Sequence, residues 1–204
     1  MNKQSGFTLV EIAIVMVIIG LLLGGVLKAQ EIITNARVKS LETDVTGLTA
    51  AIYSYQDRYR ALPGDDIRVA RFGLTTKGDG DRIIEGNFYS PAADGKESYH
   101  VWSHLRNAGL IIGEIGSTNR PENAFGGITG ISMEDSILTG FPTGRTQFVG
   151  FTDIPQDIAI IIEARSDDGH PTQGNVRATK NDGSTLSTAT DYTGEEMYYM
   201  YISL

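Results

Sequence analysis

The first part of the chain is dominated by one long apolar stretch. Phe7–Leu27 is 21 residues long and contains a single charged residue, Glu11. At about 1.5 Å per residue, an α-helix of this length spans about 30 Å, which is the hydrocarbon thickness of a bilayer. A secretory signal peptide would instead have a shorter apolar core, followed by a cleavage site of small residues. The pattern therefore predicts a membrane-spanning helix over residues 7–27, behind a polar leader of residues 1–6.

Beyond Lys28 the pattern becomes one-sided. Apolar residues recur at steps of four and three along the chain, which is the a/d pattern of a helix with one buried face: Leu41, Val45, Leu48, Ile52, Tyr55 and Tyr59. The first proline is Pro63, in a Leu-Pro-Gly-Asp-Asp turn. We expect one continuous helix from about residue 8 to about residue 60, with an amphipathic stem over residues 28–60. A coiled coil is the alternative use of the stripe, and burial within the same chain is preferred because the seam is short and ends in tyrosines.

Residues 61–204 read as short elements separated by turns, since this part holds all six prolines and most of the glycines. We expect a helix over residues 98–108, with Trp102 and Leu105 facing inward and Gly109 as its stop. Strands are expected over residues 148–151, 158–164 and 197–204, the second because it is a continuous apolar run. The predicted fold class is α+β. The long N-terminal helix, membrane-spanning in its first half, would pack against an antiparallel β-sheet in a globular head of residues 61–204.

Charge and composition narrow the possible functions. The chain has no cysteine, which excludes disulfides, iron–sulfur clusters and thiol nucleophiles. Its formal net charge is −8, and the acidic excess lies after residue 60. An acidic head argues against nucleic-acid binding, which requires a basic face. No GxSxG, P-loop or dinucleotide-binding pattern is present, so nothing in the sequence indicates an enzyme.

Glu11 is the unusual residue of the apolar stretch. A carboxylate in a membrane span is energetically costly, and such residues usually have a functional partner. Cleavage between Gly6 and Phe7 would create a new α-amino group, and the amine of a staggered neighbour could then neutralise Glu11. The simpler alternative is a carboxylate tolerated near the membrane interface. Lys3 and the original α-amino group favour the cytoplasmic side, which would place the head outside.

The segment Gly6-Phe7-Thr8-Leu9-Val10-Glu11 resembles the G-F-T-L-x-E motif of type IV prepilins and of type II secretion pseudopilins. The resemblance covers the leader and the helix that follows it. It implies cleavage after Gly6 by a prepilin peptidase, N-methylation of Phe7 by the same enzyme, and a docking role for Glu11 in a filament. One departure is the absence of proline from residues 7–60, where many major pilins have one. We expect Gly20, Gly24 and Gly25 to loosen the helix instead. Gly20 and Gly24 also form a GxxxG spacing, which is a weak association motif.

Two groups in the head could hold a metal. Asp79, Asp81 and Glu85 surround Gly80 in an oxygen-rich loop of the kind that suits calcium, with the Asp65–Asp66 pair as possible neighbours. A solvated turn is the alternative, because the spacing departs from that of an EF-hand. His100 and His104 have a zinc-compatible spacing but lack the glutamate of HExxH and a third ligand. Calcium is therefore the only cofactor considered, and none is required.

Three functions remain open. The first is a structural subunit of a type IV pilus-like filament, inserted in the inner membrane, processed, and polymerised with copies of itself or other pilins through an assembly platform. The second is a pseudopilin of a type II secretion system, and the third is a membrane-tethered binding or adhesion module. The first two share every N-terminal feature. All three predict membrane lipid as a partner and a head in the periplasm or at the cell surface.

Overall fold

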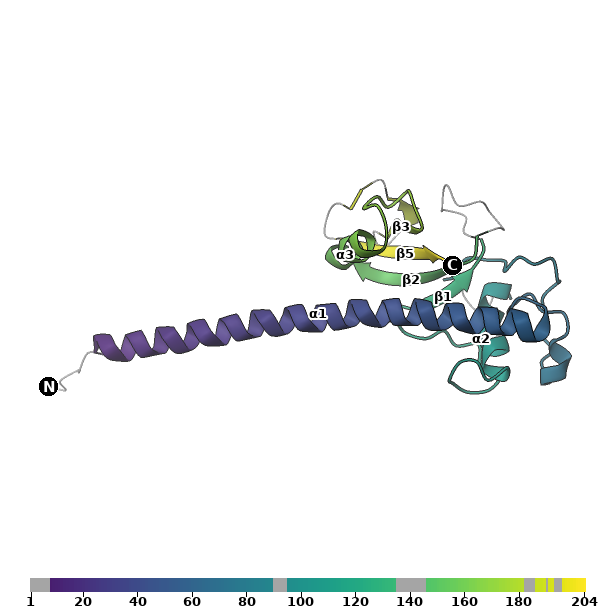
Figure 1. The fold of residues 1–204 in the computed structure, drawn as a ribbon, viewed down its shortest axis with the longest axis horizontal. Helices are drawn as coiled ribbons and strands as arrows, with labels where there is room; N and C mark the ends of the chain where they lie inside the picture. Colours follow the sequence, from purple (N-terminus) through teal and green to yellow (C-terminus); the bar gives the residue numbers. More distant parts are fainter. Residues whose placement is uncertain (1–7, 90–94, 135–145, 182–185, 190, 193–195) are drawn as a thin grey trace. The chain divides into compact units, whose positions relative to one another are not determined.

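The computed structural model describes residues 8–89, 95–134, 146–181, 186–189, 191–192 and 196–204. The chain divides into two compact units, residues 1–39 and residues 40–204. Helix α1, Leu9–Tyr59, begins in the first unit and ends in the second (Figure 1). The predicted continuous helix is thus confirmed, with each end within a residue of its expected position. The second unit also contains the C-terminal part of α1.

Over Leu9–Leu27, within the first unit, α1 is apolar on all sides apart from Glu11. Every described residue up to Ile33 is exposed, including the whole apolar stretch from Leu9 to Leu27. Among the described residues, α1 is the helix whose length and composition would allow it to cross a membrane. The first charged turn after the apolar stretch holds an ion pair between Lys28 and Glu31, with 2.7 Å between Nζ and Oε2. A helix that is apolar all round requires an apolar environment, either lipid or other helices.

In the second unit, α1 has one buried face. Leu41, Leu48, Ile52 and Tyr55 are buried, and they are a/d positions of the stem pattern. The Tyr55 ring lies 6.4 Å from those of Phe72 and His104, between the short 3-10 helix Val69–Phe72 and helix α2, Glu97–Asn107. This part of α1 is therefore buried within its own chain, as preferred over a coiled coil.

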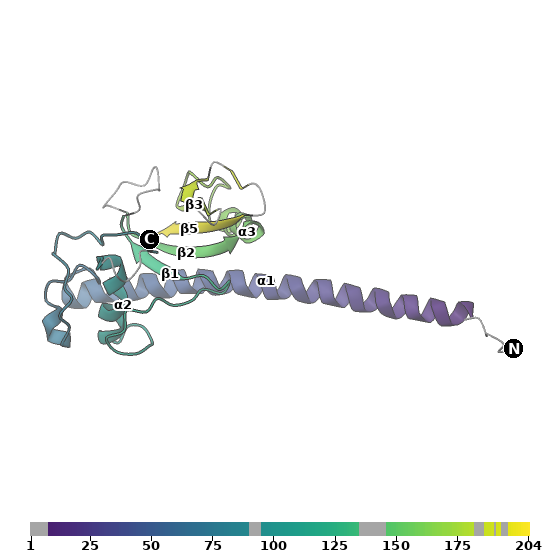
Figure 2. The same ribbon diagram turned by 180° about the vertical axis from the view of Figure 1, so that it is seen from behind.

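Five antiparallel strands form the sheet of the second unit (Figure 2). They are β1 Thr129–Ser132, β2 Phe148–Pro155, β3 Val176–Asn181, β4 Leu186–Thr188 and β5 Met197–Ser203. Their order across the sheet is β1-β2-β5-β3-β4, so the last strand of the chain lies at the centre. The α+β class and the strands predicted at 148–151 and 197–204 are confirmed.

An aromatic cluster packs where β1, β2 and β5 meet. Phe88 makes T-shaped contacts with Phe148 and Tyr201, at centroid distances of 6.3 and 5.2 Å. Gly130 in β1 and Gly150 in β2 make room for it, because a Cβ at either position would lie 2.5 Å from an atom of Phe88. Phe88 therefore packs the segment before α2 against the sheet by lying over two glycines, and Ser132 adds hydrogen bonds to the carbonyl oxygens of Ile84 and Gly86.

The two helices of the head test the remaining sequence predictions. Helix α2 agrees with the helix expected over residues 98–108, and Trp102 and Leu105 are fully buried. The strand expected over residues 158–164 is wrong, because this segment lies in helix α3, Gln156–Ser166. Ile158 and Ile162 are buried while Ile160 is 42% exposed, a spacing that only a helix produces. A short continuous apolar run does not distinguish a buried strand from a buried helix.

Candidate functional site

Helix α1 begins with a reciprocal pair of hydrogen bonds between Thr8 and Glu11. The backbone N–H and the hydroxyl of Thr8 both donate to Oε2 of Glu11, at 2.7 and 2.8 Å. The backbone N–H of Glu11 in turn lies 3.3 Å from the Thr8 hydroxyl oxygen and donates to it. This is a capping box, in which an N-cap threonine and a glutamate three residues later satisfy two orphan donors of the first turn.

The capping box changes the interpretation of Glu11. In lipid, unsatisfied backbone donors are costly, so a helix that starts within or beside the membrane needs such a cap. Oε2 of Glu11 serves the cap, whereas Oε1 has no hydrogen bond to any described residue. Glu11 therefore caps its own helix through Oε2, and its Oε1 remains available to a cation. The T-x-x-E spacing was visible in the sequence and could have indicated this second role. Gly6 and Phe7, the expected processing junction, lie outside the described residues.

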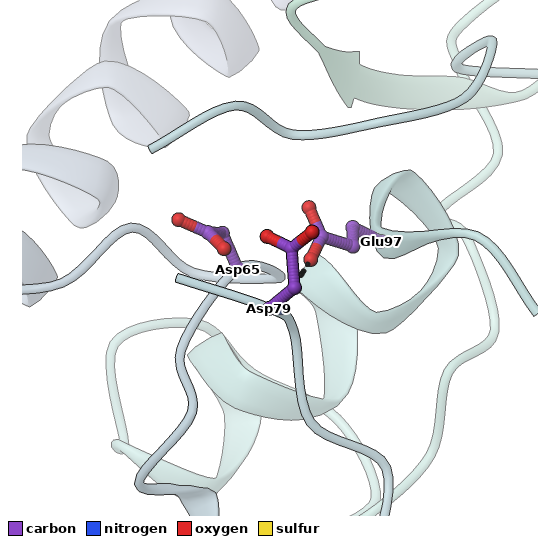
Figure 3. Close-up of side chains that lie close together, drawn as sticks. All are labelled: Asp65, Asp79 and Glu97. Atoms are coloured by element: carbon purple, nitrogen blue, oxygen red, sulfur yellow. Dashed lines mark hydrogen bonds between the residues drawn. The ribbon is translucent and has the colours of Figure 1, made fainter. Parts of the chain in front are cut away.

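A second site is the group of carboxylates in the head drawn in Figure 3. Asp65 follows the end of α1, Asp79 lies in the Gly-Asp-Gly-Asp loop, and Glu97 is the first residue of α2. One carboxylate oxygen from each lies within 4.8 Å of the other two. Asp65 and Glu97 are buried, with 3% and 7% of their surface exposed, and Asp79 is exposed.

The loop of residues 79–85 encloses the two buried carboxylates with backbone N–H groups. Gly80 and Arg82 donate to the two oxygens of Asp65, at 2.5 and 2.7 Å. Asp79 and Glu85 donate to the two oxygens of Glu97, at 3.1 and 3.3 Å. Each buried oxygen therefore has at least one donor, which buried polar groups require.

The electrostatics of this group are those of a crowded acidic site. Burial raises the pKa of Glu97 to about 7, with the Asp65 and Asp79 carboxylates adding to the rise and the backbone donors opposing it. Burial also raises the pKa of Asp65, with a further contribution from Asp79 and Asp81. Three acids that share one space disfavour full ionisation, and either a proton or a cation relieves the repulsion.

The three residues expected from the sequence to bind calcium also lie together. Oxygens of Asp79, Asp81 and Glu85 lie within 4.8 Å of one another, so Asp79 belongs to both groups. Asp79 and Asp81 each also accept a backbone N–H two residues on, from Asp81 at 3.1 Å and from Ile83 at 2.8 Å. Carboxylate oxygens are the ligands that calcium prefers. Calcium binding at these residues stays a prediction.

Sequence reasoning did not identify Glu97 and named Asp65 only as a neighbour. Asp66, the other neighbour suggested, is directed elsewhere: it accepts from the Tyr55 hydroxyl at 2.8 Å and pairs with Arg71. The local spacing of acids revealed the loop residues. The position of Glu97 depends on how α2 packs, for which the sequence holds no local signal.

The histidine pair of α2 has a structural role at His104. Its Nδ1 accepts the backbone N–H of Gly64 at 2.8 Å, and its Nε2 lies 3.3 Å from the carbonyl oxygen of Thr76. Both ring nitrogens are therefore used, with the proton on Nε2. Burial lowers the pKa of His104 to about 4, so the ring is neutral at physiological pH. This arrangement leaves no nitrogen of His104 for zinc.

Comparison with known families identifies the N-terminal segment. Residues 1–27 match the model of the prokaryotic N-terminal methylation motif. The match covers the leader and the apolar stretch, and ends before the stem. A comparison with curated protein sequences gives no match to the chain.

Proposed function

We propose that this chain, whose first 27 residues carry the class III signal peptide of type IV pilins and pseudopilins, is a structural subunit of a type IV pilus-like filament. The observation that carries the proposal is the continuity of the methylation motif with an exposed apolar helix, Leu9–Leu27. Cleavage in front of such a helix leaves it on the mature protein, where it serves first as an anchor and then as a polymerisation surface.

The subunit first resides in the inner membrane. The apolar part of α1 is long enough to span the bilayer once. In this proposal the head lies in the periplasm. A prepilin peptidase cleaves between Gly6 and Phe7 and methylates the new amine of Phe7. An assembly platform then moves the subunit from lipid into the filament, where neighbouring helices replace lipid around α1.

Glu11 directs the docking of each subunit. A carboxylate at the centre of a membrane helix costs about 3 kcal/mol on insertion scales, and less near the interface. The Phe7 amine of a neighbour supplies the opposite charge. Because the capping box engages Oε2 with Thr8, Oε1 is the oxygen that we assign to this amine. Pairing removes both charges from lipid and so favours the assembled state.

The mass of the mature protein tests the processing step. The protein isolated from cells with an active prepilin peptidase should begin at Phe7 and carry one extra methyl group. Cells without the peptidase should yield the chain that begins at Met1. A chain that keeps Met1 in the presence of the peptidase would refute the proposal.

Substitution of Glu11 tests the docking step. Glu11→Ala should leave membrane insertion and processing intact and reduce filament yield by at least tenfold. Glu11→Gln is the matched control, since it keeps an acceptor for Thr8 and removes only the charge. If Glu11→Gln assembles normally, the capping box and not the ion pair is what the filament requires.

A type II secretion pseudopilin is the second candidate, because the methylation motif is common to both classes. Electron microscopy of wild-type and deletion strains separates the two. Loss of surface filaments supports the pilus subunit. Filaments that persist, with a loss of protein secretion, support the pseudopilin. A tethered binding module predicts neither loss.

A further inference from the structure

The second unit contains a cavity of about 920 Å³ beside the end of α1. Three arginines line it, Arg60, Arg68 and Arg82, together with the exposed apolar side chains of Tyr53 and Ile67. The acids in its wall, Asp65 and Asp66, are buried and already bound to backbone N–H groups or to Arg71. The cavity therefore presents positive charge beside apolar surface.

Two of these arginines have an unusual backbone. Arg60 has a φ of 53° and Arg82 a φ of 74°, in the left-handed region that glycine and asparagine usually occupy. Such a conformation costs an L-residue about 1 kcal/mol. The Arg82 guanidinium has no hydrogen bond or ion pair with any described residue, and Arg60 has one exposed contact of 3.5 Å with Asp57. Arg60 directly follows Tyr59, the last residue of α1, where a left-handed residue commonly ends a helix. Arg82 has no such local reason, and its strained backbone and unengaged charge point to a binding role.

A protruding loop elsewhere in the unit has the complementary character. Residues 112–116, Ile-Gly-Glu-Ile-Gly, are all exposed. Ile112 and Ile115, at 96% and 77%, are the most exposed large apolar side chains among the described residues of the unit. Glu114 lies between them, with no hydrogen bond or ion pair to its side chain from the described part of the chain. The loop therefore presents a negative charge flanked by two isoleucines.

Hydrogen bonds from α2 and within the segment itself hold the loop in shape. Arg106 in α2 donates to the carbonyl oxygen of Ser117 at 2.7 Å, and the backbone N–H of Ser117 donates to the carbonyl oxygen of Glu114 at 3.1 Å. A surface that is already ordered loses little conformational entropy when it binds. Ile112 and Ile115 are therefore exposed on a turn whose conformation these hydrogen bonds already fix.

A copy of the chain does not fill its own cavity with this loop. No residue of the loop lines the cavity, which Leu204 at the end of β5 does border. In both views of the ribbon, the segment that follows α2 lies across α1 from the C-terminus (Figures 1 and 2). The two surfaces can therefore meet only between copies.

We propose that the loop Ile112–Gly116 of one copy docks into the arginine-lined cavity of the next copy. Glu114 would lie among Arg60 and Arg82, and its two isoleucines would cover Tyr53 and Ile67. Because two different surfaces pair, the contact is heterologous and repeats without closing, which is the requirement for a filament. The inference rests on the proposed function and names the contact between the heads.

Charge favours this occupant. The head carries an acidic excess, so neighbouring heads repel one another unless opposite charges meet at the contact. A cation-rich cavity in an acidic unit provides such a place, and an acidic loop of a second copy is complementary to it.

The absence of cysteine from the chain allows a direct test by cross-linking in full-length filaments. Oxidation of a variant that carries both Ile67→Cys and Ile115→Cys should give a ladder of covalent multimers. Each single variant should stay monomeric, and a mixture of the two should stop at dimers. Ile67→Cys with Ile160→Cys is the matched control, since Ile160 is an exposed isoleucine on α3, and it should give no ladder.

Charge reversal in the double-cysteine background tests the ion pair. Arg82→Glu or Glu114→Arg alone should reduce the ladder by about fivefold, and the two together should restore most of it. Filaments that form without a ladder overturn this inference and leave the proposed function intact. If no ladder forms and Arg82→Glu impairs assembly while Glu114→Arg does not, the cavity binds another anionic ligand and the proposed contact is wrong. A chain that forms no filaments and keeps Met1 would instead refute the proposed function.

Discussion

Replacing Glu163 with glutamine should stabilise the head, and increasingly so as the pH rises. Glu163 lies on α3 and is fully buried. Its Oε2 accepts the hydroxyl of Tyr192 at 2.9 Å, while its buried Oε1 has no hydrogen bond to any described residue. Burial raises the pKa of Glu163 to about 7, with Asp167 and Asp168 adding to the rise and the Tyr192 bond opposing it. Glu163→Gln keeps the acceptor for Tyr192 and removes the ionisation.

The sign and size follow from proton linkage. An acid with a pKa of about 7 when folded and an ordinary value of 4.5 when unfolded favours the folded state below pH 4.5. That contribution is lost as the pH rises through 7. A shift of this size corresponds to at most about 3 kcal/mol at pH 8. We therefore expect Glu163→Gln to be about 1–3 kcal/mol more stable than wild type at pH 8, and equal to it near pH 4.5.

The assay is thermal unfolding of the full-length protein in detergent, followed by the fluorescence of Trp102. Trp102 is the single tryptophan and is fully buried in α2, so its signal reports the head. For a unit of this size, 1–3 kcal/mol corresponds to a rise of about 2–12 °C in Tm. The comparison is made between variant and wild type at each pH. This cancels the opposing contribution of His104, whose lowered pKa makes it stabilising above pH 6.5 and less so as the pH falls toward 4.

Glu122→Gln is the control, because Glu122 is an exposed glutamate of the same unit. It should leave Tm within about 1 °C of wild type at every pH. A Glu163→Gln effect of equal size at pH 5 and pH 8 would refute the reasoning, since a neutral acid and an amide would then differ for reasons other than charge. A loss of stability at pH 8 would show that the carboxylate has a cationic partner.

Three further predictions concern the head. Calcium at millimolar concentration should raise the Tm of the wild type, and Asp79→Asn should reduce the rise; an unchanged Tm in wild type would remove the calcium hypothesis. Ile162→Ala should cost about 2–4 kcal/mol and Ile160→Ala less than about 1 kcal/mol, because only Ile162 is buried in α3, whereas a strand would place both on one face and make their costs alike. Gly150→Ala should cost about 1–3 kcal/mol in the same unfolding assay, because its Cβ would lie 2.5 Å from the Phe88 ring; a cost near zero would show that this ring can move away.

The elements that could be predicted from the sequence are those with a long or strongly periodic pattern. Helix α1 has both an uninterrupted apolar stretch and a stripe that ends at Tyr59, so its two ends were predictable to within a residue. The error at residues 158–164 arose because the exposed face of α3 is also apolar at Ile160, so the run of apolar residues is continuous and its pattern does not distinguish a helix from a strand. Pro155, the last residue of β2 and the N-cap residue of α3, marks a boundary between two elements and could have corrected it.

The candidate sites could likewise be predicted only where their residues lie close together in the sequence. Thr8 and Glu11 are local in sequence, and so are Asp79, Asp81 and Glu85, so spacing alone brings each set together. Contacts such as those from Asp65 to the N–H groups of Gly80 and Arg82 join segments that only packing places side by side. The cavity lined by Arg60 and Arg82 also depends on packing between distant segments. The hydrophobic pattern of the sequence does not indicate that these arginines have a left-handed backbone.

The loop of residues 79–85 holds its two buried carboxylates through main-chain N–H groups, and this has a consequence for how such proteins diverge. Any residue except proline supplies an N–H, so, apart from Gly80 with its φ of 86° and the buried Ile84, the side chains of this loop are free to change while its path is kept. Asp65 and Glu97 have no such freedom, and Gly78 has none either, because a Cβ there would lie 2.3 Å from the Cα of Asp65. Related heads would then be traced by an aspartate, a glycine and a glutamate in separate segments, around a loop that keeps its path and its buried isoleucine while its exposed residues differ.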